Sequence, residues 1–221
     1  MLSREQAAAM LALQAEINRR IDPRWVEKAF PYLRAAIVEG AEAIEHHGWK
    51  WWKKQERDTA QLRMELVDIW HFLLSEVLLR ENGDEARALE RLLRPLEDDS
   101  AAAGAIHFDG GVHDPSSMDL LRKLELLIGL GVSRRIDLRL FGAILADCGM
   151  SWGDLHRQYV GKNVLNLFRQ DHGYKEGRYR KHWAGREDNE HLSEILDSLN
   201  PEAADYRNRI HAELTRRYAL E

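Results

Sequence analysis

The sequence predicts an all-α protein built as a single domain. Apolar residues recur with the 3.6-residue period of a helix over long stretches, and alternating strand patterns are almost absent. Prolines number only five among the 221 residues, so helices have few forced breaks. A chain of this length is typical of one domain with a sizeable core.

The periodic stretches, with their start and stop signals, predict the individual helices. Asp22-Pro23 and Asn82-Gly83 are stop signals, and Ser151 has the character of an N-cap. The segment 98–117 is rich in Ala, Gly and Asp, which predicts a loop, and we expect 84–150 to be a mobile or inserted subdomain within the single domain 1–221. The expected helices span 4–20, 24–46, 58–81, 84–94, 118–130, 135–147, 152–171, 189–198 and 201–219.

Bulk composition excludes several classes of function. The net charge of −5 disfavours a nucleic-acid-binding protein, because no basic stripe lies outside one local segment. No apolar run is long enough to span a bilayer, and the N-terminus lacks the pattern of a signal peptide. The single cysteine, Cys148, excludes an intramolecular disulfide and fits a cytoplasmic protein.

Two pairs of carboxylates carry the first chemical signal. Glu39 and Glu42 are three residues apart on one expected helix, and Glu65 and Asp68 are three apart on the next. Residues at this spacing share a helix face, so the four carboxylates converge if the helices pack antiparallel. Converging carboxylates repel one another unless cations lie among them, and Mg²⁺ prefers oxygen ligands together with substrate phosphates.

A solvated helix face is the competing explanation, and it suits one pair better than the other. Glu39 and Glu42 lie away from the apolar stripe of their helix, so solvation alone could account for them. The helix of Glu65 and Asp68 is apolar over most of its surface, and buried carboxylates are costly unless paired or coordinated. His71 follows one turn later and is either a core residue or a partner of a ligand.

A basic segment carries the second signal. Residues 159–189 hold seven Lys and Arg against four Asp and Glu, in a chain that is acidic overall. Lysine and arginine suit phosphate oxygens, and glycine allows the backbone to approach a ligand closely. No Gly-rich nucleotide fingerprint is present. The donors at helical spacing are Lys162, Asn163, Asn166, Arg169 and Gln170, and Gly173 and Gly177 bracket Tyr174 and Lys175.

Taken together, these motifs resemble the dimeric all-α dUTPase family, within the all-α NTP pyrophosphatase superfamily. The resemblance rests on LQAEIN (13–18), EGAE (39–42), WKWWK (49–53), ELVDIWHFLLS (65–75) and KNVLNLFRQDHGYKEGRYRKHWAGREDN (162–189). It covers most of the chain, and the region 84–150 is its least recognisable part. It implies a helical bundle with a helical insertion, and a homodimer.

The resemblance also implies a reaction and a set of residues. The reaction would be Mg²⁺-dependent hydrolysis of dUTP, and of dUDP, to dUMP, with attack at the β-phosphorus, which limits incorporation of uracil into DNA. Glu39, Glu42, Glu65 and Asp68 would hold Mg²⁺, and either Glu39 or Glu42 would orient or deprotonate water. Gln14 and Asn18 would recognise the edge of uracil, and Trp51 would form an aromatic wall of the nucleoside pocket. The residues that would bind phosphate or sugar are Lys162, Asn166, Arg169, Tyr174, Lys175 and Lys181. Asp188 and Asn189 close the last motif without an assigned role.

Two alternative functions stay open at this point. The scaffold could hydrolyse another deoxynucleotide such as dCTP, because the amides of Gln14 and Asn18 can turn to suit either base. It could also serve as a regulatory module that binds a protein partner in a nucleotide-dependent way. One departure from the family is Glu45 followed by His46 and His47, which we expect to influence metal affinity.

Overall fold

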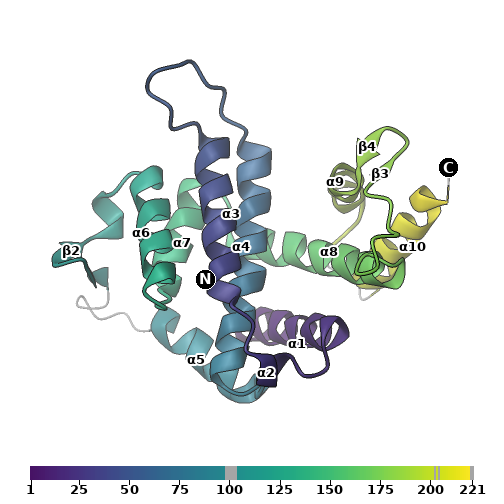
Figure 1. The fold of residues 1–221 in the computed structure, drawn as a ribbon, viewed down its shortest axis with the longest axis horizontal. Coiled ribbons are helices and arrows are strands. Elements are labelled where there is room, and N and C mark those ends of the chain that lie inside the picture. The colour runs from purple at the N-terminus through teal and green to yellow at the C-terminus, as the bar shows by residue number, and fades with distance from the viewer. Residues whose placement is uncertain (98–103, 202, 204, 220–221) are drawn as a thin grey trace.

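The computed structural model describes residues 1–97, 104–201, 203 and 205–219, and it confirms the all-α fold (Figure 1). The helices are α1 Arg4–Ile21, α2 Trp25–Lys28, α3 Tyr32–His47, α4 Thr59–Arg80, α5 Glu85–Glu97, α6 Leu120–Val132, α7 Leu138–Asp147, α8 Trp152–Asp171, α9 Asp188–Ser198 and α10 Tyr206–Tyr218. The described residues also form two small antiparallel hairpins, β1 Ile106–Phe108 with β2 Gly111–His113 and β3 His182–Trp183 with β4 Arg186–Glu187, and one 3₁₀ turn, Pro115–Ser117.

The centre of the molecule is the pair formed by α3 and α4, which run alongside each other and are joined by a long loop (Figure 1). Helix α6 packs against the other side of α3. The contact is close at Gly40, where a Cβ would lie 3.0 Å from Ile128 Cγ1 of α6. Helix α6 therefore covers one side of α3, and the polar face of α3 lies on another side of the helix.

Helix α4 is the most buried helix of the fold, as its apolar sequence predicts. Its indole Trp70 is fully buried and stacks on Phe141 of α7, with ring centroids 5.2 Å apart. Leu92 of α5 and Leu124 of α6 belong to the same hydrophobic core. Helices from 84–150 thus contribute to the main core, while the mobility expected for that region stays a prediction.

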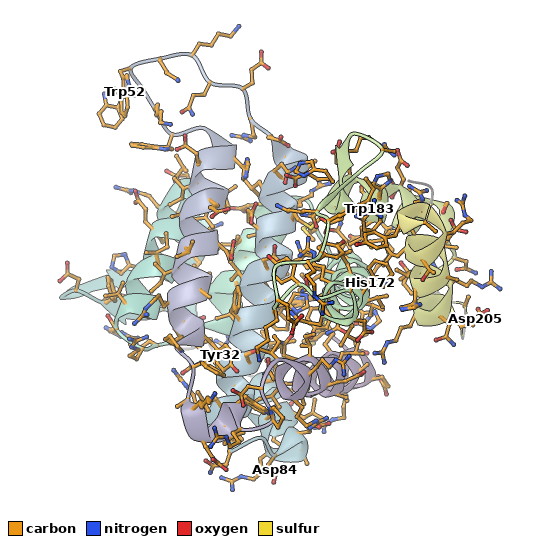
Figure 2. The ribbon with its side chains drawn as sticks, turned by 45° about the vertical axis from the view of Figure 1, so that its right-hand side comes forward. Tyr32, Trp52, Asp84, His172, Trp183 and Asp205 are labelled. Carbon is orange, nitrogen blue, oxygen red and sulfur yellow. The ribbon has the colours of Figure 1, made fainter. Side chains whose placement is uncertain are left out.

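A second, smaller core lies at the C-terminal end. The last turns of α8 pack with α9 and α10 around Phe168 and Trp183, both fully buried. Figure 2 shows the labelled Trp183 among the dense side chains beside α8. A Cβ on Gly161 would lie 2.6 Å from Leu196 Cδ2, so a larger residue there would displace the Leu196 side chain of α9.

Several predicted helix boundaries were wrong in informative ways. The expected helix 24–46 is broken into α2 and α3, because Ala29 adopts a left-handed φ of 45° and Pro31 begins a new helix. The expected helix 84–94 continues past Pro95 to Glu97. The expected helix 201–219 corresponds to the shorter α10, and residues 202 and 204 of that expectation lie outside the described part of the chain.

The prediction of a loop over 98–117 was only partly correct. Its first residues, 98–103, lie outside the described part of the chain. Residues 106–113 form the hairpin β1–β2, in which Asp109 and Gly110 take positive φ values of 48° and 73°. The Asp-Gly pair is a hairpin-turn signal that the composition-based prediction overlooked.

The predicted N-cap was accurate: Ser151 forms a capping box with Asp154 at the start of α8. Helix α1 also begins with a capping box, between Ser3 and Gln6, which was not predicted from the sequence. None of the helices within the described ranges is both long and apolar enough to cross a membrane.

Candidate metal and nucleotide site

Three of the four predicted metal-binding carboxylates meet between α3 and α4. One carboxylate oxygen each from Glu39, Glu42 and Glu65 lies within 4.8 Å of the others. Glu65 is buried, Glu39 is half-buried and Glu42 is exposed, so the cluster opens toward solvent at one side. The two helices pack side by side and are joined by a loop at one end (Figure 1), and this antiparallel packing brings Glu65 next to the Glu39 and Glu42 pair.

The electrostatics of this cluster favour a bound cation. Burial and the charges of Asp68, Glu65 and Glu42 raise the pKa of Glu39 to about 8. Burial and the charges of Asp68 and Glu42 raise the pKa of Glu65 to about 7, against the opposing charge of Lys162. The cause of both shifts is the cost of crowding carboxylates in a partly buried place. Carboxylate oxygens at this spacing fit a divalent cation.

Asp68 lies beside the cluster and is paired with a lysine. Lys162 Nζ of α8 donates to Asp68 Oδ2 at 2.9 Å, and the lysine side chain is only 5% exposed. This contact links the carboxylates of α3 and α4 to α8, the helix that carries Lys162 and Arg169 and is called the basic helix below. The imidazole of His46 also lies near the cluster, with Nε2 3.4 Å from Glu65 Oε1. Glu45, by contrast, accepts hydrogen bonds from Trp49 and Lys50. Its carboxylate therefore stabilises the loop after α3 and does not take part in the cluster.

The donors on α8 are held by one another and by α9. Asn166 Oδ1 accepts from Arg169 Nη1 at 3.1 Å. Arg169 forms a two-pronged pair with the buried Asp188, at 2.8 Å for both contacts. Lys162 also donates to Asn189 Oδ1 at 3.2 Å. Two residues without an assigned role, Asp188 and Asn189, are thus the partners of two predicted phosphate-binding cations.

Gln14 and Asn18 lie in a buried network that also contains three residues from α4 and α8. Gln14 Nε2 donates to Asn18 Oδ1 at 3.2 Å and to Ser75 Oγ at 2.7 Å. Gln14 Oε1 contacts Tyr159 OH at 2.7 Å and His71 Nδ1 at 2.8 Å. The amide of Gln14 is therefore fully occupied, whereas Asn18 Nδ2 and His71 Nε2 are buried without a partner among the described residues.

His71 is a residue whose part in this network the sequence left undecided. Complete burial lowers the pKa of His71 to about 4, so the ring is neutral at physiological pH. If Nδ1 donates to Gln14 Oε1, then Nε2 presents a lone pair. Its spacing of three residues from Asp68, on a helix buried on most sides, was the available signal.

The remaining predicted site residues are not gathered around the carboxylates. Trp51 is 85% exposed on the loop between α3 and α4, and its ring lies edge-on to the indoles of Trp49 and Trp52. Figure 2 shows the labelled Trp52 at the far end of that loop. The roles predicted for these residues stay predictions. Tyr174 lies 5.9 Å from the Arg169 guanidinium, Lys175 Nζ donates to Ile21 O at 3.1 Å, and Lys181 Nζ lies 3.4 Å from Glu187 Oε2.

The fold and the site together define an all-α protein with a cluster of carboxylates beside a basic helix. A comparison with family models finds one match, described as dUTPase, over residues 6–174. The chain therefore belongs to the all-α dUTPase family, whose members are enzymes of the dUTP-hydrolysing type and generally use a divalent metal. The resemblance seen in the motifs is thus confirmed. A search of curated proteins found no match.

Proposed function

We propose that this protein hydrolyses dUTP to dUMP and pyrophosphate with Mg²⁺, and that it also accepts dUDP. The observation that carries the proposal is the convergence of Glu39, Glu42 and Glu65 within 4.8 Å, next to the Lys162–Asp68 pair. Phosphate hydrolysis needs a divalent cation, a water and cationic donors within a few ångströms of each other. Family membership supplies the substrate class.

The carboxylates fit Mg²⁺ both in ligand type and in charge. Glu39, Glu42, Glu65 and Asp68 would hold it, and the ion would neutralise phosphate charge and favour ionisation of the attacking water. Glu39 and Glu42 are the candidates for orienting that water, because both lie on the α3 side of the cluster. Lys162, whose ammonium already lies beside Asp68, would receive the phosphates from the α8 side.

The buried network supports a pocket for a pyrimidine edge. As arranged here, Asn18 offers an unpaired N–H donor and His71 an unpaired acceptor. Uracil presents the complementary pair, with O4 accepting and N3–H donating. Gln14 would then act by fixing the orientation of Asn18 and His71, and not by touching the base.

The same network is the reason to keep dCTP as a second candidate. If the amides of Gln14 and Asn18 turn together, Asn18 presents an acceptor and His71 presents a donor. Cytosine has that pattern at N4–H₂ and N3. Ser75 and Tyr159 can adapt to either arrangement, because a hydroxyl both donates and accepts. The choice of base thus depends on the orientation of one hydrogen-bonded chain.

We further propose a homodimer in the cytoplasm, in line with the family resemblance and with Cys148, which is free and buried. Light scattering on the purified chain measures its mass in solution. A monomeric mass at micromolar concentration would remove the dimer from the proposal.

The test is turnover of dUTP, dUDP, dCTP, dTTP and UTP with Mg²⁺, using Glu42→Ala/Asp68→Ala as the inactive reference. We expect dUTP and dUDP to be hydrolysed and the double variant to be inactive. Turnover in H₂¹⁸O locates the attack, because label in pyrophosphate indicates the β-phosphorus and label in dUMP the α-phosphorus. Preferred turnover of dCTP would replace uracil by cytosine as the base, and no turnover by a metal-loaded protein would refute the enzyme proposal.

A further inference from the structure

The start of α9 holds two cations of α8, Lys162 and Arg169. Asp188, the first residue of α9, is fully buried, and its two carboxylate oxygens accept from Arg169 Nε and Nη2 at 2.8 Å each. Tyr179 OH donates to Asp188 Oδ2, also at 2.8 Å. The next residue, Asn189, accepts from Lys162 Nζ at 3.2 Å and from Arg169 Nη2 at 3.4 Å. Neighbouring residues of one helix thus fix two side chains that lie seven residues apart on another.

The Arg169–Asp188 contact has the character of a permanent pair. Burial opposes ionisation of Asp188, yet the hydrogen bonds and charge of Arg169 keep the pKa of this carboxyl below its ordinary value. A buried, two-pronged pair is rigid, and removal of one partner leaves an uncompensated charge. Asp188 is therefore ionised at neutral pH and fixes the plane of the guanidinium.

The geometry limits what Arg169 can offer a ligand. Four of its five N–H groups are occupied by hydrogen bonds to described residues: Nε and one on Nη2 to Asp188, one on Nη2 to Asn189 and one on Nη1 to Asn166. One N–H on Nη1 is left for a phosphate oxygen. Lys162, held between Asp68 and Asn189, has a third N–H for the same purpose.

The chain beyond the family match places these two residues. The hairpin β3–β4 leads directly into α9, and Asp188 N donates to Lys181 O at 2.9 Å. Trp183, fully buried, is bonded through its carbonyl to His191 Nε2 at 2.9 Å, which ties the hairpin to α9. Gly161, next to Lys162, leaves room for the Leu196 side chain of α9. All of this lies after residue 174, the last residue matched, except Gly161 itself.

We propose that Asp188 and Asn189 are positioning residues for phosphate binding, acting through Arg169 and Lys162. This inference rests on the proposed function, since it assumes that those two cations meet the phosphates of a nucleotide. It adds Tyr179, Asp188 and Asn189, which lie beyond residue 174, to the residues that support the site. It also assigns Tyr179 as the residue that fixes the Asp188 carboxylate from its other side.

The experiment compares Asp188→Asn and Asn189→Ala with the control Asp147→Asn in the full chain. Asp147, whose side chain is 33% exposed, accepts from the buried Lys123 at 2.7 Å, so its substitution breaks another ion pair of a buried cation, between α6 and α7 and outside the proposed site. The readouts are the affinity for Mg²⁺-pyrophosphate by calorimetry, kcat and KM for dUTP, and the thermal midpoint. The ¹⁵N signal of Arg169 Nε–H, identified from its loss in Arg169→Lys, reports directly on the pair.

We expect Asp188→Asn to weaken pyrophosphate binding and to lower kcat/KM by about 10- to 100-fold, the usual cost of losing a partner that orients a ligand-binding group. The Arg169 Nε–H signal should shift, and Asp188→Asn should add nothing further in an Arg169→Gln background. Asp147→Asn should lower the thermal midpoint alone. If Asp188→Asn fails to fold, Tyr179→Phe makes the same test, since it removes one hydrogen bond and no charge.

Two outcomes would overturn the inference. One is an Asp188→Asn or Tyr179→Phe protein that loses thermal stability as Asp147→Asn does, with pyrophosphate affinity and kinetics unchanged. The other is wild-type protein that does not bind pyrophosphate, because there is then no phosphate site to position. A protein that binds pyrophosphate but hydrolyses no nucleotide would refute the proposed function while the binding comparison still tests the positioning role.

Discussion

Lys162 Nζ lies 2.9 Å from Asp68 Oδ2, and both atoms stand at the edge of a cluster of three further carboxylates. A buried ammonium thus partly compensates the negative charge that α3 and α4 gather. The lysine and a divalent cation would compete for the same carboxylate. Their balance gives the first prediction.

Replacement of Lys162 by methionine should strengthen the binding of Mg²⁺ or Mn²⁺ by about tenfold. Removal of a positive charge a few ångströms from the cluster leaves Asp68 unpaired and increases its attraction for a cation. The measurement is Mn²⁺ titration of the nucleotide-free protein, followed by electron paramagnetic resonance. The matched control is Lys123→Met, which removes the other buried lysine bonded to an aspartate. Equal or weaker metal binding by Lys162→Met would contradict the competition.

The metal-free protein should lose stability as the pH rises. The pKa values of Glu39 and Glu65 are raised from 4.5 to about 8 and about 7, so the folded state binds more protons than the unfolded state across that range. Their contribution to stability is complete below about pH 4.5 and is lost as the pH rises through the folded pKa values. Denaturant unfolding in chelator between pH 5 and 9 measures this slope.

Glu39→Gln should flatten that slope, because it removes the group with the higher pKa of the two. Saturating Mg²⁺ should also flatten it, since the ion replaces the bound protons. The control Glu125→Gln, an exposed glutamate on α6 outside the cluster, should leave the slope as it is in wild type. A wild-type slope that does not differ from that of Glu39→Gln would show that the carboxylates do not interact as the geometry indicates.

Asn18→Asp should reduce the preference for dUTP over dCTP by about 100-fold or more. The substitution replaces the unpaired N–H donor by an acceptor, which opposes uracil O4 and suits the amino group of cytosine. The measurement is the ratio of kcat/KM for the two nucleotides. Asn18→Leu, which offers neither a donor nor an acceptor, should lose activity on both nucleotides without shifting the preference toward dCTP. An unchanged ratio in Asn18→Asp would mean that Asn18 does not face the base.

The local parts of this structure were predictable from the sequence. Helix periodicity and the Ser151 cap gave α8 its correct bounds, and the three-residue spacing of Glu39 and Glu42 put them on one face. The prediction failed where a single residue overrides the period. The backbone turns at Ala29 and Pro31 and divides the helix that the apolar stripe predicted over 24–46, and Asp109-Gly110 makes a turn inside an apparent loop.

The contacts that give the site its character were not predictable, because they join distant positions. The Lys162–Asp68 pair spans 94 residues and the Gln14–Tyr159 contact spans 145. No local sequence pattern predicts either of these two contacts. The motifs identified the chemistry of Asn18 and Lys162, whereas only the packing of α1, α4 and α8 reveals which of their atoms remain available.

Trp51 gives the last prediction, because its expected role and its position differ. It is 85% exposed at the end of the loop between α3 and α4, in edge contact with Trp52 at 4.7 Å between ring centroids. A wall for the nucleoside would require the loop to move toward α8 when substrate binds, and an indole that becomes covered by a base changes its fluorescence. We expect a non-hydrolysable dUTP analogue with Mg²⁺ to quench and blue-shift tryptophan emission. Trp51→Phe should remove most of this change, and the control Trp52→Phe should retain it. If Trp51→Phe responds to the analogue as wild type does and keeps its KM, then Trp51 does not contact the nucleoside.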